Sequence, residues 1–266
     1  MLGKLIKYDL KASAKLFILL HALYLAACLF CRVFFISHID FNGPEEPLIT
    51  ACAIVLALTL FLIAALSLGT WLIITFRFYR NLFSREGYLS WTLPVSGLNQ
   101  LWAKIISGYV YMALDIILIA AGILILVTGR NVTDAYAMIA SDVTEELGMN
   151  ITSYALKIFL YSIAACISSV IMTYFCITIG QLFPGHRVLC ALAAYFITSL
   201  VIQFISIFLM FTLGYAPGGM FLISDGSTVA DYTFKTLGLS SVLMFLATVL
   251  EYIATHIIIK KKVNLL

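Results

Sequence analysis

The chain has 266 residues, of which 63% are hydrophobic and only 11% are charged. A soluble domain carries roughly 25% charged residues, so one globular core of this length cannot hide so many apolar side chains. The composition therefore excludes an ordinary soluble protein and predicts an all-α integral membrane protein. A closed β-barrel is also excluded, because the apolar runs are continuous rather than alternating.

Six apolar runs are long enough to cross a bilayer. Each meets or exceeds the roughly 20 residues that a helix needs to span a hydrocarbon layer of ~30 Å. We predict one transmembrane domain over residues 1–266, with six spans near 16–36, 48–76, 105–127, 154–180, 188–213 and 239–259.

The segment before the first span carries lysines at spacings of three and four. This spacing predicts an interfacial amphipathic helix over residues 1–15, with its basic side chains toward anionic headgroups. The alternative is a segment that only fixes the topology. The residues concerned are Lys4, Lys7, Lys11 and Lys15.

The second apolar run is too long for one perpendicular crossing. As a helix, residues 48–76 would measure about 43 Å at 1.5 Å per residue. The helix must tilt or continue beyond the membrane. If it continues, it carries Arg77, Tyr79 and Arg80 out on a rigid stalk.

Residues 77–104 form a long basic and aromatic segment between runs that are nearly free of charge. Pro94 disfavours helix in the residue before it, and Ser96 can cap the helix that follows. We predict a short cytoplasmic helix or turn near residues 84–92, between two protruding helices. Its apolar residues are Tyr88, Leu89, Trp91 and Leu93.

The distribution of charge predicts the orientation. With six spans, the lysine-rich N-terminus, residues 77–104, Arg187 and the lysine tail 260–262 all lie on one side. The positive-inside rule places that side, with both termini, in the cytoplasm. The acidic connections lie outside, and the one over residues 129–153 has room for a small helix. The acidic residues are Asp40, Glu45, Glu46, Asp134, Asp142, Glu145, Glu146, Asp225 and Asp231.

Two carboxylates lie inside predicted spans. Asp115 is near the middle of the third span, and Glu251 is about two turns before the lysine tail. A central Asp costs at least ~2.5 kcal/mol on insertion scales, so such a group faces the bundle interior, a partner or water. The two residues are candidates for a translocation path or a gate, or else for buried structural contacts. Gln203 is a weaker candidate that can simply hydrogen-bond between helices.

Motifs for catalysis are absent from the sequence. It contains no G-x-x-x-x-G-K-[ST] phosphate loop and no H-E-x-x-H or G-x-S-x-G motif. Its four histidines lie in different segments, so their spacing does not indicate a metal site. We expect no enzymatic activity, metal or cofactor in this chain, and no nucleic-acid partner.

Two blocks, MLGKLIKYDLKASAKLF and RFYRNLFSREGYLSWTLPVS, resemble small permease subunits of bacterial ABC transporters. The resemblance is to the ABC-2-type exporter class common in Gram-positive bacteria. It implies a six-helix subunit of the bacterial cytoplasmic membrane that pairs with a second copy or a paralogue. A separate ATPase, which holds ATP and Mg²⁺, would bind from the cytoplasm. The external loop 214–238 would be a place for short re-entrant helices.

The same resemblance assigns roles to residues. The N-terminal helix looks like the interfacial elbow of the family, and residues 77–104 look like its coupling segment. Arg80 and Arg85, with Glu86, would set the register on the ATPase. The positions that match the family block are Glu86, Gly87, Tyr88, Leu89, Thr92, Leu93 and Pro94.

The expected function is export of an amphipathic substrate, such as a peptide, an antimicrobial compound or a lipid-like molecule. Two other classes stay open. An ion-coupled secondary transporter would use Asp115 and Glu251, although the sequence has no inverted repeat to support it. A membrane scaffold or assembly protein would have no substrate path.

Overall fold

The computed structural model describes residues 2–39, 41, 44–84, 87, 92, 94–214 and 228–261. This part of the chain is helical and contains no strand. Six of its helices are long and apolar enough to span a membrane, which confirms the prediction of an all-α multi-pass membrane protein. The elements are α1 (Leu2–Phe34), the 3-10 helix η1 (Ile36–His38), α2 (Glu45–Phe83), α4 (Gly97–Val127), α5 (Arg130–Leu147), α6 (Ile151–Gly180), α7 (Arg187–Thr212) and α8 (Val229–Lys261).

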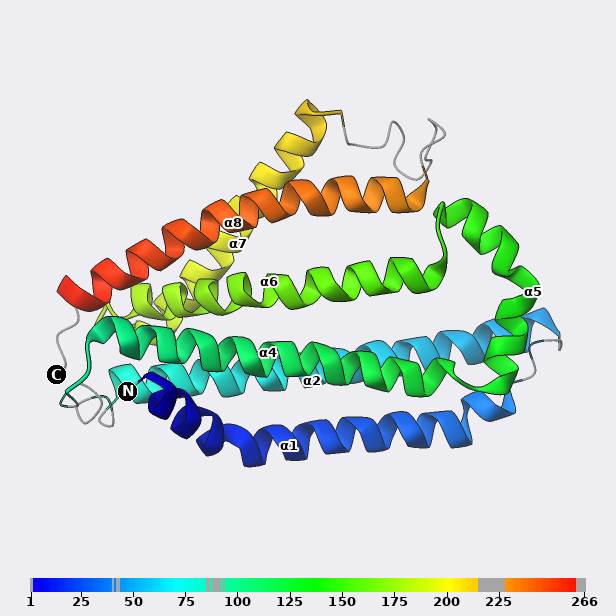
Figure 1. Cartoon of the computed structure of the whole chain (residues 1–266), viewed down its shortest axis with the longest axis horizontal. Helices are drawn as coiled ribbons and strands as arrows, with labels where there is room; N and C mark the ends of the chain where they lie inside the picture. Colours follow the sequence, from blue (N-terminus) through cyan, green and yellow to red (C-terminus); the bar gives the residue numbers. More distant parts are fainter. Residues whose placement is uncertain are drawn as a thin grey trace.

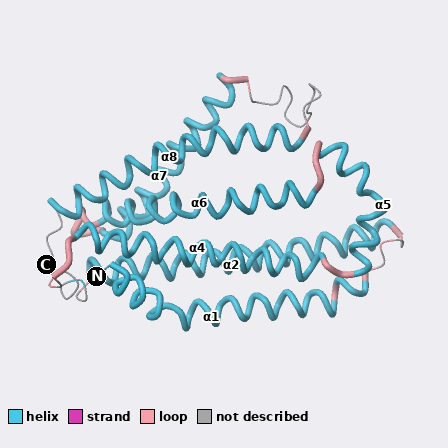
Figure 2. Tube along the Cα trace, in the orientation of Figure 1, coloured by secondary structure: helices cyan, strands magenta, loops and turns pink. Residues whose placement is uncertain are grey.

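Helices α1, α2, α4, α6 and α8 run roughly along one axis, α7 is steeply inclined to them, and successive helices alternate in direction (Figure 1). The starts of α1, α4 and α7 and the ends of α2, α6 and α8 lie together at the left of the view, which we call the basic end. The opposite end, here the acidic end, carries α5, which lies across the axis of the long helices. Figure 2 shows most of the connections at these two ends, whereas the end of α7 lies away from both.

Helix α1 packs on its neighbours through one continuous face. Its buried residues recur every three or four positions, as expected for one stripe of a helix. Gly122 on α4 allows a close approach, because a Cβ there would lie 2.4 Å from the Tyr24 hydroxyl oxygen. The buried stripe comprises Asp9, Ser13, Phe17, His21, Tyr24 and Cys28.

The N-terminal segment does not form a separate helix. Helix α1 begins at Leu2 and continues without interruption into the first span, because no glycine or proline follows Gly3 within it. Its first turns run at an angle to the rest (Figure 1). Lys4, Lys7, Lys11 and Lys15 are all exposed, and their interfacial position stays a prediction.

Helix α2 continues well beyond one bilayer thickness, as its long apolar run predicts. Its 39 residues correspond to about 58 Å of helix. Arg77, Tyr79 and Arg80 lie in its last turns. Helix α4 then begins at Gly97, and the side chain of Ser96 accepts a hydrogen bond from the Asn99 N–H, as the sequence predicts.

The helices at the acidic end agree only in part with those predicted from the sequence. The predicted small helix is present as α5. Helix α8, however, begins at Val229 rather than near residue 239, so the last part of the expected loop 214–238 is helical. Thr228 caps it by accepting the Asp231 N–H at 3.3 Å. Residues 215–227, the place for a re-entrant feature, lie outside the described residues.

Candidate functional site

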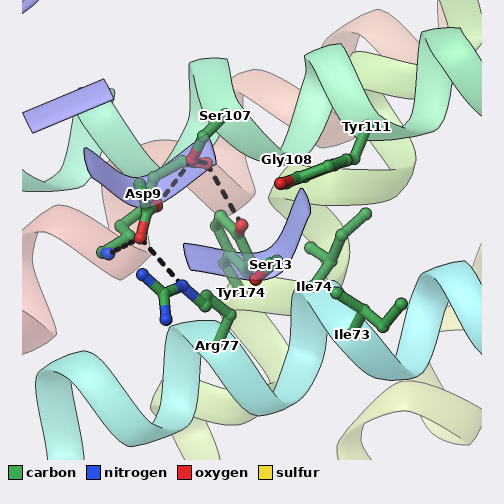
Figure 3. A pocket seen from close by; sticks show the side chains of 10 residues that line it. Asp9, Ser13, Ile73, Ile74, Arg77, Ser107, Gly108, Tyr111 and Tyr174 are labelled. Atoms are coloured by element: carbon green, nitrogen blue, oxygen red, sulfur yellow. Dashed lines mark hydrogen bonds and ion pairs between the residues drawn. The ribbon is translucent and has the colours of Figure 1, made fainter. Parts of the chain in front are cut away.

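A buried carboxylate organises the basic end of the bundle. Asp9 on α1 is 6% exposed and points between the end of α2 and the start of α4 (Figure 3). Four side chains contact it, and we call these five residues the Asp9 cluster. They are Asp9, Arg77, Asn81, Lys104 and Ser107.

The Asp9 carboxylate has partners for both oxygens. Its Oδ1 accepts from Lys104 Nζ at 2.6 Å and from Arg77 Nε at 3.2 Å. The same oxygen accepts from Asn81 Nδ2 at 3.1 Å. Oδ2 accepts from Ser107 Oγ at 2.7 Å. One anion thus faces two cations, and among the described residues it is the carboxylate that compensates both of them.

Helix α6 is joined to the same region by aromatic side chains. The Tyr174 hydroxyl donates to the Lys104 carbonyl oxygen at 3.1 Å. The Tyr174 ring stacks on Phe78 of α2, with centroids 3.8 Å apart and planes 6° apart. Beside this contact, the hydroxyl of Tyr111 on α4 donates to the carbonyl oxygen of Leu10 on α1. Four helices are therefore held together beside the Asp9 cluster.

The Asp9 cluster is a contact between helices rather than a ligand site. The cavity beside it measures only about 10 Å³, which is room for no more than one water molecule. Its chemical role is to fix the last turns of α2 and the first turns of α4 relative to α1. These are the two helices that enter and leave the predicted coupling segment.

The predicted coupling residues are only partly described. Arg80 is exposed on α2, and Thr92 and Pro94 are exposed before α4. Gly87 N–H donates to the Ser84 carbonyl oxygen at 2.8 Å, and a Cβ on Gly87 would lie 2.7 Å from the Leu82 carbonyl oxygen. Only glycine fits this turn. Arg85, Glu86, Tyr88, Leu89 and Leu93 lie outside the described residues.

A second polar cluster lies farther along the same three helices. Asp115 on α4 is buried, and its Oδ1 lies 2.8 Å from His21 Nε2 and accepts from Thr70 Oγ1 at 2.8 Å. Oδ2 accepts from Ser67 Oγ at 3.4 Å. His21, Ser67, Thr70 and Asp115 form what we call the Asp115 cluster. The carboxylate faces α1 and α2, and this matches the alternative of a buried contact between spans.

The His21 ring bridges α1 to the Asp115 cluster. Its Nδ1 lies 2.8 Å from the Phe17 carbonyl oxygen, which can only accept, so Nδ1 is the donor of this hydrogen bond. Its Nε2 lies 2.8 Å from Asp115 Oδ1, so the ring contacts the carboxylate from the side of α1.

The other two intramembrane candidates do not join Asp115. Glu251 on α8 is 6% exposed, and its Oε1 is buried without a hydrogen-bond partner among the described residues. Gln203 is exposed on α7. Within the part of the chain that the structure describes, no hydrogen bond connects either residue to Asp115.

Sequence reasoning missed Asp9 and did not pair His21 with Asp115, although the sequence contains a signal for both. Asp9, Ser13, Phe17 and His21 are spaced by four residues and therefore lie along one face. An acidic residue in register with an apolar helix face indicates a buried ion pair. The pairing with Lys104 and Arg77 required knowledge of which helices are neighbours.

Comparison with known proteins does not assign the chain to a family: no family model, no curated protein and no solved structure matches it.

Proposed function

We propose that the chain is the permease subunit of an ATP-driven ABC exporter in the bacterial cytoplasmic membrane, with both termini in the cytoplasm. The proposal starts from the resemblance of its two sequence blocks. The observation that carries it is the clamp at the basic end. Asp9 ties the end of α2 to the start of α4, and these helices flank the segment that resembles a coupling helix.

In this proposal, a separate ATPase docks at the segment between α2 and α4. Tyr88 and Leu89 are apolar anchors for a groove on the ATPase, while Arg80, Arg85 and Glu86 set the register at the rim. Buried apolar anchors supply most of the binding free energy of such a contact, and rim charges tune its specificity.

Force applied to the docked segment would reach the membrane through rigid elements. Helix α2 continues over 39 residues and α4 over 31 residues without a break. Because the Asp9 cluster ties both to α1, the three helices would move as one body. The substrate is an amphipathic molecule, and the subunit works as a pair with a second copy or a paralogue.

Photocrosslinking tests the docking claim. A photoreactive amino acid replaces Leu89 in the tagged protein, and irradiated native membranes are probed for a crosslinked product that binds an ATP analogue. The matched control places the same amino acid at Met138, which is exposed on α5 at the other end. We expect an ATP-binding product from position 89 only. No such product, or equal products from both positions, would contradict the proposal.

One observation favours a second candidate, an ion-coupled transporter. Glu251 presents a buried carboxylate oxygen without a partner among the described residues, and such groups mark ion and proton pathways in membrane proteins. This function predicts uptake or release that collapses with the ion gradient and that stops in Glu251→Gln. Transport that continues without a gradient but requires ATP would exclude it.

A further inference from the structure

A cavity of about 260 Å³ opens between α2, α6 and α7 in the half of the bundle nearer the basic end. Aromatic and aliphatic side chains make up most of its wall. They include Trp71, Phe76 and Tyr79 of α2, Ile177 of α6, and Leu192 and Tyr195 of α7. The cavity is separate from the Asp9 and Asp115 clusters, which share no residue with it.

Two aromatic side chains of the cavity wall contact each other. The rings of Trp71 and Tyr195 have centroids 5.8 Å apart, and Trp71 Nε1 donates to Thr173 Oγ1 at 3.0 Å. At the basic end, α7 rests directly on α6. A Cβ on Gly180 would lie 2.4 Å from the Arg187 carbonyl oxygen.

Two polar atoms at the cavity wall have no hydrogen-bond partner among the described residues. Arg187, the first residue of α7, lines the cavity, and its Nε is buried and unpaired within the described part of the chain. Thr75 Oγ1 on α2 is buried and unpaired as well. No described carboxylate forms an ion pair with Arg187. A buried guanidinium nitrogen without a partner is costly, so the site calls for an anionic acceptor.

We propose that an anionic phospholipid from the leaflet at the basic end occupies this cavity, with one acyl chain inside it and its phosphate on Arg187. The apolar wall suits an acyl chain, and a volume of about 260 Å³ has room for part of one chain. Phosphate matches the geometry of a guanidinium and forms charge-assisted hydrogen bonds with it. This binding needs no ATPase and is independent of the proposed function.

The fluorescence of Trp71 can report on lipid in the cavity, because this side chain is part of the cavity wall. The protein carries three tryptophans, so Trp91→Phe and Trp102→Phe leave Trp71 as the sole reporter. This protein is reconstituted in phosphatidylcholine nanodiscs that contain increasing fractions of brominated phosphatidylglycerol or of brominated phosphatidylcholine. We expect half-maximal quenching by phosphatidylglycerol at a mole fraction about tenfold lower, because its headgroup is a net anion, whereas the choline cation of phosphatidylcholine offsets the attraction of its phosphate to Arg187.

Three variants of the same reporter protein distinguish recognition of the lipid headgroup from binding of the acyl chain. Arg187→Gln should remove the preference for phosphatidylglycerol. Thr75→Phe should fill the cavity and weaken quenching by both lipids, without breaking any hydrogen bond of Thr75 Oγ1. Arg130→Gln removes an exposed cation on α5 at the acidic end, far from the cavity, and should change nothing.

Equal quenching by the two lipids in the unmodified reporter would overturn the proposal. So would an unchanged preference in Arg187→Gln. Arg187 is only partly buried, and a monodisperse elution profile checks that this variant is folded. If Thr75→Phe does not fold, the Arg187→Gln comparison decides alone.

Discussion

Helices α1, α2 and α4, here the α1–α2–α4 block, and helix α7 are built in opposite ways. The block contains two buried polar clusters, each centred on one carboxylate with partners from several helices. Helix α7 has no buried residue at all. Its apolar side chains, such as Phe196, Phe204 and Phe211, are exposed along its length, and it diverges from the bundle toward the acidic end (Figure 1).

This difference shows which helices are held in register by contacts within the chain itself. Polar contacts inside a membrane fix the register of helices, because an unpaired group in hydrocarbon is costly. The block is thus a single defined unit. Helix α7 presents an apolar surface that suits lipid or a second subunit, and in the proposed exporter this surface belongs to the side that moves or pairs.

Asp9→Asn should destabilise the α1–α2–α4 block more than the other variants do. The change removes the anion that compensates Lys104 and Arg77, and loss of one partner of a buried ion pair costs about 3–5 kcal/mol. We expect the largest fall in thermal unfolding temperature of all the variants, measured in detergent. Asp134→Asn on exposed α5 is the control, and equal falls in both variants would show that the Asp9 cluster does not hold the block.

Gly122→Ala tests the contact between α1 and α4. The added methyl group would lie 2.4–2.6 Å from atoms of the buried Tyr24, and overpacking of this kind costs about 1–3 kcal/mol. Gly238→Ala on α8 is the matched control, because nothing lies within 4 Å of its Cβ position. We expect the control to gain about 0.5–1 kcal/mol from helix propensity. The same sign of change in both proteins would refute the close packing.

Thr70→Val removes one hydrogen bond from Asp115 while keeping the shape of the side chain. Interhelical hydrogen bonds in membranes contribute about 0.6 kcal/mol on average and up to about 1.7 kcal/mol. Thr59→Val is the control on the same helix, since its hydroxyl donates only to the Val55 carbonyl oxygen one turn earlier. Thr70→Val should unfold at a lower temperature than Thr59→Val. Identical unfolding temperatures would mean that the hydrogen bond between Thr70 and Asp115 does not stabilise the protein.

Phe204→Leu on α7 should have the smallest effect. The side chain is exposed, and substitutions at such positions change stability by no more than about 0.5 kcal/mol. The unfolding temperature should match that of the unmodified protein. A loss comparable to that of Gly122→Ala would show that this face of α7 is packed against another subunit in the purified protein.

Much of the fold follows from the sequence, because the six spans and the long α2 are determined by runs of apolar residues. The cap at Ser96 was also predictable, since its hydrogen bond is local. The start of α8 was not, because Asp231 and Lys235 interrupt the apolar run although both are compatible with helix. The unbroken α1 was missed for a similar reason: its lysines suggested a separate surface segment.

The sites were less predictable than the spans. Asp115 stood out because a carboxylate in hydrocarbon is rare, but its partners lie on other helices. His21 and Thr70 are 94 and 45 residues away in sequence. Asp9 was hidden among lysines, and only the register of α1 reveals it. The cavity near Arg187 depends on how α7 rests on Gly180, which no pattern within one helix encodes.

ATP hydrolysis that co-purifies with the chain tests the central claim most directly. The tagged protein is purified from its native membrane as unmodified chain, as Tyr88→Asp with Leu89→Asp, and as Leu182→Asp with Phe183→Asp. The last pair is exposed and apolar at the basic end. The account predicts ATPase activity that is retained with the unmodified chain and the control but lost with the variant at 88 and 89. ATPase activity that is absent throughout, or that survives at positions 88 and 89, would contradict it.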